Sequence, residues 1–119
     1  MPPHDDAETV LNALLAALDQ AEPARAAAQA WPLLGPGPAG QVGDRAGLAR
    51  LLANDRHRGL LAPIARELRV WDRRARAARA ELLVTPRHGE APHTWLLTLA
   101  CGADGRWSLS GLQREGFEG

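Results

Sequence analysis

The chain is poor in the residue types that support disulfides, metal cages and membrane spans. It has one cysteine, one methionine, one phenylalanine and no tyrosine in 119 residues. The single thiol, Cys101, cannot form an internal disulfide or a cysteine-based metal cage, which suits a reducing cytoplasm. No uninterrupted apolar run approaches the roughly 20 residues of a membrane span, and the N-terminus lacks the basic region of a signal peptide. We therefore expect a cytoplasmic protein with no membrane partner.

An excess of charge of one sign is also missing. The sequence has 14 basic and 14 acidic residues, so no overall field draws the molecule to nucleic acid or to an anionic surface. All 14 basic residues are arginine, which together with the abundant alanine, glycine and proline indicates a GC-rich genome more than a need for guanidinium groups. The length predicts a single domain over 1–119, with residues 1–5 as a frayed tail.

The N-terminal half has the pattern of helices. Asp5 and Glu8 are spaced like a capping box at a helix N-terminus, and apolar residues then recur at spacings of three and four, which predicts one buried stripe. The stripe consists of Val10, Leu11, Leu14, Leu15 and Leu18. Glu22 and Pro23 end this helix. The run from Pro23 to Ala30 predicts a short second helix, because proline is tolerated at the first helical position.

The segment from Leu33 to Gly43 contains Gly-Pro-Gly-Pro and predicts a loop without regular structure. It is not a phosphate-binding loop, since its prolines remove backbone N–H donors and no Gly-Lys-Ser/Thr sequence follows. Asp44 then has the position of a cap for a third helix. The predicted apolar face of that helix is Ala46, Leu48, Leu51 and Leu52, and the chain beyond it offers Leu60, Leu61 and Ile64 to the core.

The C-terminal half alternates apolar and polar residues, with turn residues between the runs, which predicts consecutive antiparallel strands. The four runs are Arg66–Asp72, Ala78–Thr85, His93–Cys101 and Trp107–Gln113. In the first run we expect Leu68 and Val70 on one side and Arg69 and Trp71 on the other. The fold class is therefore predicted as α+β, a cone in which about three N-terminal helices pack on a curved antiparallel sheet of about four strands.

Leucine recurs on both faces of the predicted sheet. Leu82 and Leu97 share one face, whereas Leu83 and Leu96 fall on the other. Apolar side chains on the second face imply that part of it is covered. A partner copy of the chain is the simplest cover, so we expect a homodimer through the sheet.

Three short motifs connect this architecture to a family. They are Ala-Leu-Leu-Ala-Ala-Leu-Asp at 13–19, Pro-Leu-Leu-Gly-Pro at 32–36 and Gly-Arg-Trp-Ser-Leu-Ser-Gly at 105–111. In this order the chain resembles a small branch of the nuclear transport factor 2-like superfamily, the cystatin-like α+β cone. The resemblance implies a site in the apolar cavity between the concave face of the sheet and the helices. The superfamily contains catalysts, carriers and scaffolds, and without tyrosine the chain lacks the phenolic donor of a steroid isomerase.

The leading hypothesis is a non-catalytic small-molecule-binding or protein-interaction domain with a small apolar pocket and no cofactor. The residues predicted to bind the ligand are Trp31, Leu52, Trp71, Trp95 and Trp107, although tryptophan is also a common core residue. The alternative is a cofactor-independent lyase, isomerase or hydrolase of the polyketide-cyclase type, with His57 or Asp72 as its base. A solvated or hydrogen-bonded role stays open for both of these side chains.

Arginines cluster around the first predicted hairpin. Arg69, Arg73 and Arg74 predict an anion-binding site. The competing interpretation is an edge strand guarded by charge, because Glu67 and Glu81 are interspersed and neutralise the cluster. That neutralisation disfavours nucleic acid as a partner.

Histidines near the second predicted hairpin could serve as metal ligands. His88 and His93 flank the turn, and His4 or Glu90 would complete a set. The spacing is not that of a zinc site, so no metal is predicted.

Overall fold

The predicted α+β class is confirmed. The computed structural model describes residues 6–87 and 89–115. Over these residues the helices are α1 (Ala7–Leu18), α2 (Pro23–Ala30), η2 (Trp31–Leu33), α3 (Pro36–Val42), α4 (Arg45–Ala53) and η3 (Arg58–Leu60), where η denotes a 3-10 helix. The strands are β1 (Ala65–Arg73), β2 (Ala77–Thr85), β3 (His93–Cys101) and β4 (Trp107–Arg114). They form one antiparallel sheet in the order β1-β2-β3-β4.

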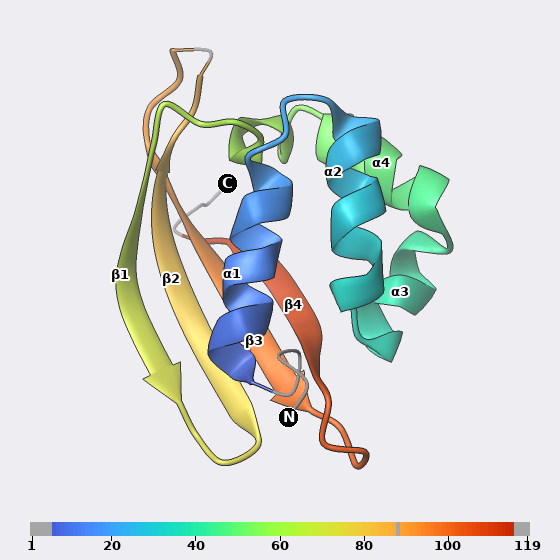
Figure 1. The fold of residues 1–119 in the computed structure, drawn as a ribbon. Helices are drawn as coiled ribbons and strands as arrows, with labels where there is room; N and C mark the ends of the chain where they lie inside the picture. Colours follow the sequence, from blue (N-terminus) through green and yellow to red (C-terminus); the bar gives the residue numbers. More distant parts are fainter. Residues whose placement is uncertain (1–5, 88, 116–119) are drawn as a thin grey trace.

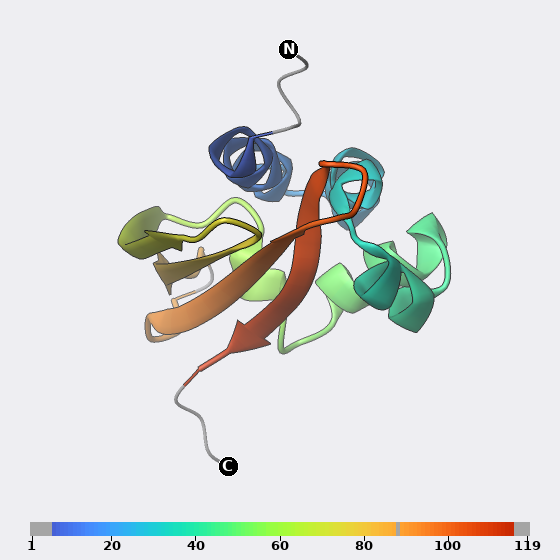
Figure 2. The same cartoon turned by 90° about the horizontal axis from the view of Figure 1, so that it is seen from below.

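The helices of the described chain lie on one side of the sheet and beside one of its edges. The sheet curves around α1, which contacts β3 and β4 (Figure 1). The second helix, α2, packs against both α1 and α4. Seen from below, α3 and α4 lie beside β4, at the far end of the sheet from β1 (Figure 2). The two edges of the sheet therefore have different surroundings.

The N-cap of helix α1 lies one residue later than predicted. Asp6 has an extended backbone and its Oδ1 accepts a hydrogen bond from Glu8 N at 3.3 Å. Asp5 lies outside the described residues, and with Asp6 as the cap Glu8 stands too early for a reciprocal capping box. The apolar stripe buries Val10, Leu11, Leu14 and Leu18, as predicted. Leu15 is only partly buried.

The predicted loop over 33–43 is wrong, because Pro36–Val42 forms helix α3. Pro36 and Pro38 occupy the first and third positions of the helix. The backbone N–H groups of the first turn have no partner within a helix, so proline costs nothing there. Ala39 N donates to Gly35 O at 3.0 Å, and Gly43, with a φ of 89°, ends the helix.

Helix α4 is capped by Asp44, as predicted. Asp44 Oδ1 accepts from Gly47 N at 2.8 Å. Leu48 and Leu52 are buried, but Ala46 is exposed and does not belong to the apolar face. After η3 the chain buries Leu60 and Leu61.

Ile64 does not join the core, contrary to prediction. Its side chain is 70% exposed. Ala62 has a positive φ of 45° and is followed by Pro63, so the chain turns away from the helices before β1 starts. Ile64 then lies at the open edge of the sheet, where its N donates to Thr85 O at 3.0 Å.

The alternation predicted for the second and third strands is confirmed, and that of the first strand is broken by a bulge. Ala80, Leu82 and Leu97 are at most 1% exposed on the helix side. In β1 the register shifts between Leu68 and Val70, so that Leu68 lies opposite Leu82 and Trp71 lies opposite Ala80. Leu68 and Trp71 thus share the helix side, whereas Val70 lies opposite Glu81 on the other face. One extra residue in a strand moves every later side chain to the opposite face.

Candidate binding site

A groove of about 290 Å³ lies between α3, α4 and the edge strand β4. Most of its wall is apolar, formed by Leu34, Pro38, Val42, Leu48, Leu51, Leu109 and Leu112. Its polar side chains are Gln41, His57, Ser110 and Gln113, of which only His57 titrates near neutral pH. An apolar depression with a few polar groups is the usual form of a small-molecule site.

Local backbone features hold the groove open beside β4. Leu34 forms a parallel bridge with Leu109, and Gly35 N donates to Leu109 O at 2.8 Å, which fixes the start of α3 against the strand. In β4 the register shifts, because Thr98 lies opposite Gly111 and Leu99 opposite Leu109, with Ser110 as the extra residue. Bulges of this kind are frequent next to functional sites, where they redirect side chains.

His57 is held in the groove by the end of α4 and by the sheet. Its Nδ1 and the Oδ1 of Asn54 are 2.9 Å apart, and its backbone N donates to the same oxygen at 2.9 Å. The ring packs on Trp95 of β3, with 5.4 Å between the ring centroids and an angle of 45° between the planes. The imidazole therefore has a hydrogen-bond partner on α4's C-terminal cap and an aromatic neighbour on the sheet.

The surroundings of His57 favour its neutral form. Burial lowers the pKa of the imidazole below its usual 6.5, because a half-buried ring loses hydration that stabilises the cation. The positive charges of Arg56 and Arg114 lower this pKa further. At neutral pH the groove thus contains an uncharged imidazole.

The five residues predicted to bind a ligand do not share one cavity. Trp95 is 2% exposed and meets the groove only through His57. Leu52 is buried in the core, and Trp31 and Trp71 are half-buried and packed against it. Trp107 lies in the wall of a second hollow, of about 490 Å³, between the Pro32–Pro36 segment and the β3–β4 hairpin. The charged side chains there, Asp104 and Arg106, are exposed, so water competes for every polar contact.

Asp72 lies far from His57, on the face of the sheet that points away from the helices. It pairs with Arg79 across the β1–β2 ladder. Arg74 Nε and Nη2 donate to its carboxylate at 3.1 and 3.2 Å, and this hydrogen bonding lowers the pKa of Asp72. A carboxylate with a lowered pKa is a weak base.

The three arginines predicted to bind an anion point to different partners. Arg74 pairs with Asp72, and Arg69 Nε lies 3.9 Å from a carboxylate oxygen of Glu67. The guanidinium carbon of Arg73 lies on the other side of the sheet, 5.2 Å from the centre of the Trp107 ring. The structure does not bring the three together.

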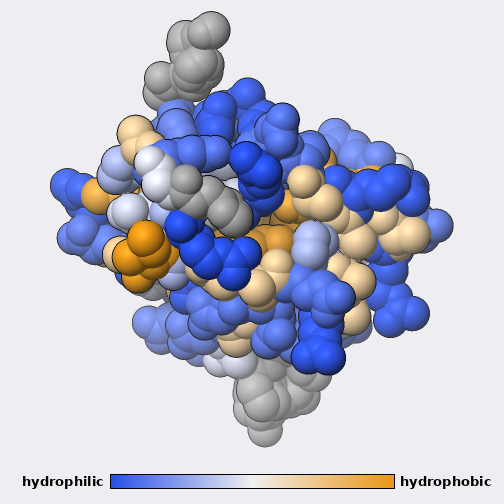
Figure 3. All heavy atoms as spheres, turned by 90° about the horizontal axis from the view of Figure 1, so that it is seen from above, coloured by the Kyte–Doolittle hydropathy of each residue, from blue (hydrophilic) through white to orange (hydrophobic). Residues whose placement is uncertain are grey.

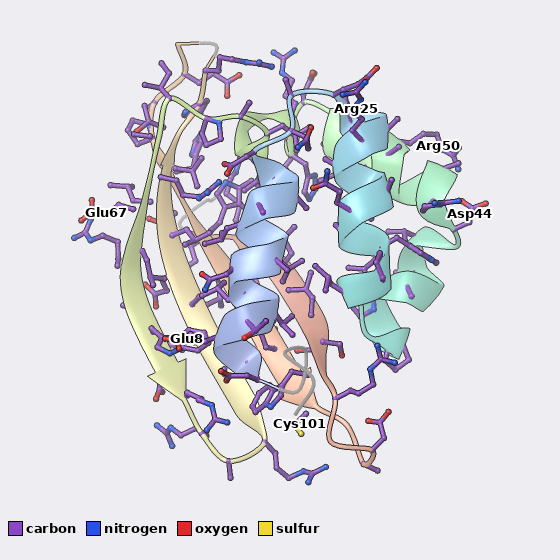
Figure 4. The ribbon with its side chains drawn as sticks, viewed as in Figure 1. Glu8, Arg25, Asp44, Arg50, Glu67 and Cys101 are labelled. Atoms are coloured by element: carbon purple, nitrogen blue, oxygen red, sulfur yellow. The ribbon has the colours of Figure 1, made fainter. Side chains whose placement is uncertain are left out.

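The face of the sheet turned away from the helices is open along β1 and β2, whereas the start of α3 adjoins its far corner, where Pro36 and Pro38 line a hollow with Ala100 and Ser110. Figure 4 shows Glu67 on this side of β1, pointing away from the helices. We call this surface the outer face and define it by Glu67, Asp72, Arg79, Glu81, Leu83, Thr94, Leu96, Thr98 and Ala100. Leu83 and Leu96 are half-buried there by their neighbours on the strands.

Sequence reasoning singled out His57 but not the residues that make its site. Asn54, Gln41, Val42 and Leu112 were missed, since the segment that forms α3 was expected to be a loop without regular structure. One feature of the sequence could have indicated Asn54. An Asn three residues before a His at the end of a helix has the spacing for a side-chain oxygen to accept from the later backbone N–H.

Several other properties of the described chain bear on the site. No three His, Cys, Asp or Glu side chains within 6–87 and 89–115 are placed to hold a metal ion. His4 and His88 lie outside these residues. No described helix is long and apolar enough to cross a membrane. Comparison with family models, with curated proteins and with solved structures finds no match to this chain.

Proposed function

We propose that this chain is a small-molecule-binding domain and that the groove between α3, α4 and β4 is its binding site. One observation carries the proposal: a neutral, oriented imidazole in the wall of a mostly apolar groove. The resemblance to the cystatin-like cones of the nuclear transport factor 2-like superfamily supports it, as does the curvature of the sheet around α1 (Figure 1). In such a cone we expect ligands between helices and sheet.

The size of the groove limits the ligand. Its volume of about 290 Å³ is near the lower end of the roughly 300–1,000 Å³ usual for ligand pockets. Burying apolar surface contributes about 25 cal/mol per Å², so a ligand of this size gains its affinity mainly from the leucine, valine and proline wall. The polar groups of the groove then decide how the ligand is oriented.

Binding is preferred to catalysis because of what surrounds His57. A lyase or isomerase of the polyketide-cyclase type needs a base and a partner that stabilises developing charge. His57 suits the first role, but no other described residue in the groove wall is titratable. Asp72, the other candidate base, lies on the outer face.

A pair of tryptophan variants tests the proposal. Leu51→Trp fills the groove from α4, and Leu83→Trp makes the same change at a half-buried leucine on the outer face. Titration of ¹⁵N-labelled protein with 4-ethyltoluene and with 4-ethylphenol should shift amide resonances of groove residues such as Val42 and Leu112. The shifts should disappear in Leu51→Trp and persist in Leu83→Trp. Shifts that map to the outer face, or no shifts with either compound, would show that the groove is not the site.

The partner that we propose in addition is a second copy of the chain, bound through the outer face. Leu83 and Leu96 are diagonal neighbours on β2 and β3, with Thr94 opposite Leu83 and Glu81 opposite Leu96, and no element of the described chain covers them. Charges of both signs adjoin them, with Arg79 Nη2 3.4 Å from Glu81 Oε2. A face with balanced charge and central leucines is self-complementary, as a two-fold interface requires.

A further inference from the structure

The hydrogen bonds of Asn54 fix which nitrogen of His57 carries the proton. The His57 backbone N–H can only donate, so the Asn54 atom that it meets is the carbonyl oxygen Oδ1. The same Oδ1 lies 2.9 Å from Nδ1 and can only accept. In the neutral imidazole Nδ1 therefore carries the hydrogen, and Nε2 has a free lone pair. The hydrogen bonds of His57 to Asn54 use its backbone N and Nδ1.

We infer that the groove selects uncharged ligands that carry one hydrogen-bond donor, such as a phenol or an alcohol, and that the donor is received by Nε2 of His57. Asn54 is the positioning residue. The inference rests on the proposed function, since it specifies the ligand of the same groove. A donor that meets Nε2 gains a hydrogen bond in apolar surroundings, whereas a ligand without a donor leaves the lone pair unmatched.

Charges near His57 allow a competing ligand class with the opposite pH dependence. Arg56 on the same turn and Arg114 on β4 are the charged residues that act on the ring. The neighbouring Arg58 interacts with Asp55 and Glu90. Trp95 and the groove residues of α3 and α4 carry no charge. These arginines would also attract an anion, but an anion binds better when His57 is protonated, whereas a neutral donor binds better when it is not.

The test compares three probes of similar shape at pH 7.5. These are 4-ethylphenol, which has a donor, 4-ethyltoluene, which replaces the hydroxyl by a methyl group, and 4-ethylbenzoate, which is an anion. Dissociation constants come from the amide shifts of groove residues. We expect 4-ethylphenol to bind about fivefold more tightly than 4-ethyltoluene, which is the effect of one net hydrogen bond. We also expect 4-ethylbenzoate to bind more weakly than 4-ethylphenol.

Two variants separate the roles of His57 and Asn54. His57→Phe keeps a flat ring without an acceptor and should make the affinities for 4-ethylphenol and 4-ethyltoluene equal. Asn54→Asp keeps the oxygen acceptor but adds a negative charge that stabilises the imidazolium. The preference for 4-ethylphenol should therefore be lost at a higher pH in Asn54→Asp than in the unmodified protein. A purely structural role of Asn54 would not move this pH profile.

The outcomes distinguish the inference from the proposed function. Equal binding of 4-ethylphenol and 4-ethyltoluene in the groove would overturn the inference and leave the proposed function standing. Tighter binding of 4-ethylbenzoate, strengthening as the pH falls, would also overturn it, in favour of an anion site. If neither neutral probe binds, the proposed function fails and the inference fails with it. Should His57→Phe not fold, the pH profile of Asn54→Asp still decides.

Discussion

At the scale of single residues, the lowered pKa of His57 links the groove to the stability of the fold. In the unfolded chain a histidine titrates near pH 6.5, and in the folded chain burial and the charges of Arg56 and Arg114 lower that pKa. Between the two values the unfolded chain binds more protons. The free energy of unfolding must then fall as the pH drops from about 6.5 towards the folded pKa. Above pH 6.5 His57 is neutral in both the folded and the unfolded chain, and its contribution to the free energy of unfolding is fully present.

We predict that His57→Gln removes this pH dependence, because glutamine does not titrate. Urea unfolding at several values between pH 5.5 and 7.5 measures it. His93→Gln, which removes a histidine from β3, is the matched control and should keep the dependence that comes from His57. An unchanged slope in His57→Gln would contradict the assignment of an uncharged imidazole in the folded chain.

At the scale of elements, α3 and α4 depend on a close approach at their junction. A Cβ atom on Gly47, in the first turn of α4, would collide with the backbone oxygen of Val42 at the end of α3. Gly40, within α3, has open space at the same position. Both glycines lie in helices. Comparing their substitution by alanine therefore separates the effect of the junction from the effect of helix propensity.

We expect Gly40→Ala to raise the free energy of unfolding by about 0.5–1 kcal/mol, the usual gain of alanine over glycine in a helix. Gly47→Ala should lower it by about 1–3 kcal/mol, the range for forced overpacking, and should also weaken probe binding because α3 forms one wall of the groove. Urea unfolding and the amide shifts with 4-ethyltoluene measure the two effects. A stabilised Gly47→Ala would show that the junction is not tight.

Elements whose residues follow a regular pattern could be predicted from the sequence. Features that depend on where a single residue falls within a helix or strand could not. Strands β2 and β3 alternate with period two, so their core side was foreseeable. Helix α3 was missed because glycine and proline are read as breakers, although Pro36 and Pro38 fall where a helix tolerates them. The bulge in β1 was missed because one inserted residue leaves no periodic trace.

The candidate site was predictable only in part for a related reason. His57 stood out as a titratable residue after a helix. Its groove joins Leu34 to Gln113, and convergence over that separation is a property of the tertiary structure. The predicted tryptophans lie in the core, pack against it or line a separate hollow instead, since a large apolar side chain gains most where it is removed from water.

At the scale of the whole molecule, charged residues are unevenly distributed over the surface. Hydrophilic residues interrupt the apolar ones at the upper end of the molecule (Figure 3). On the outer face, the charged pairs lie along β1 and β2, with Glu67 near Arg69 and Glu81 near Arg79. The outer positions of β3 are uncharged. The half of the outer face around Leu96 is therefore the part from which water is most readily removed.

The size of this face sets the strength of the proposed dimer. Four strands spaced about 4.8 Å apart, with a rise of about 3.3 Å per residue, give a face of roughly 20 by 30 Å, or about 600 Å². Stable interfaces bury about 800 Å² per partner. We therefore expect a weak homodimer that dissociates on dilution.

Light scattering after size-exclusion chromatography should detect this dimer at tens of micromolar and above. Leu96→Glu places a charge at the centre of the outer face and, in a two-fold interface, brings two like charges together, so it should give a monomer. Leu68→Glu is the control, because Leu68 is 46% exposed on the helix side of the β1 edge and should leave the dimer intact. If the unmodified protein is a monomer throughout this concentration range, Leu83 and Leu96 are surface leucines of an isolated chain, and the four-stranded face is too small to hold two copies together.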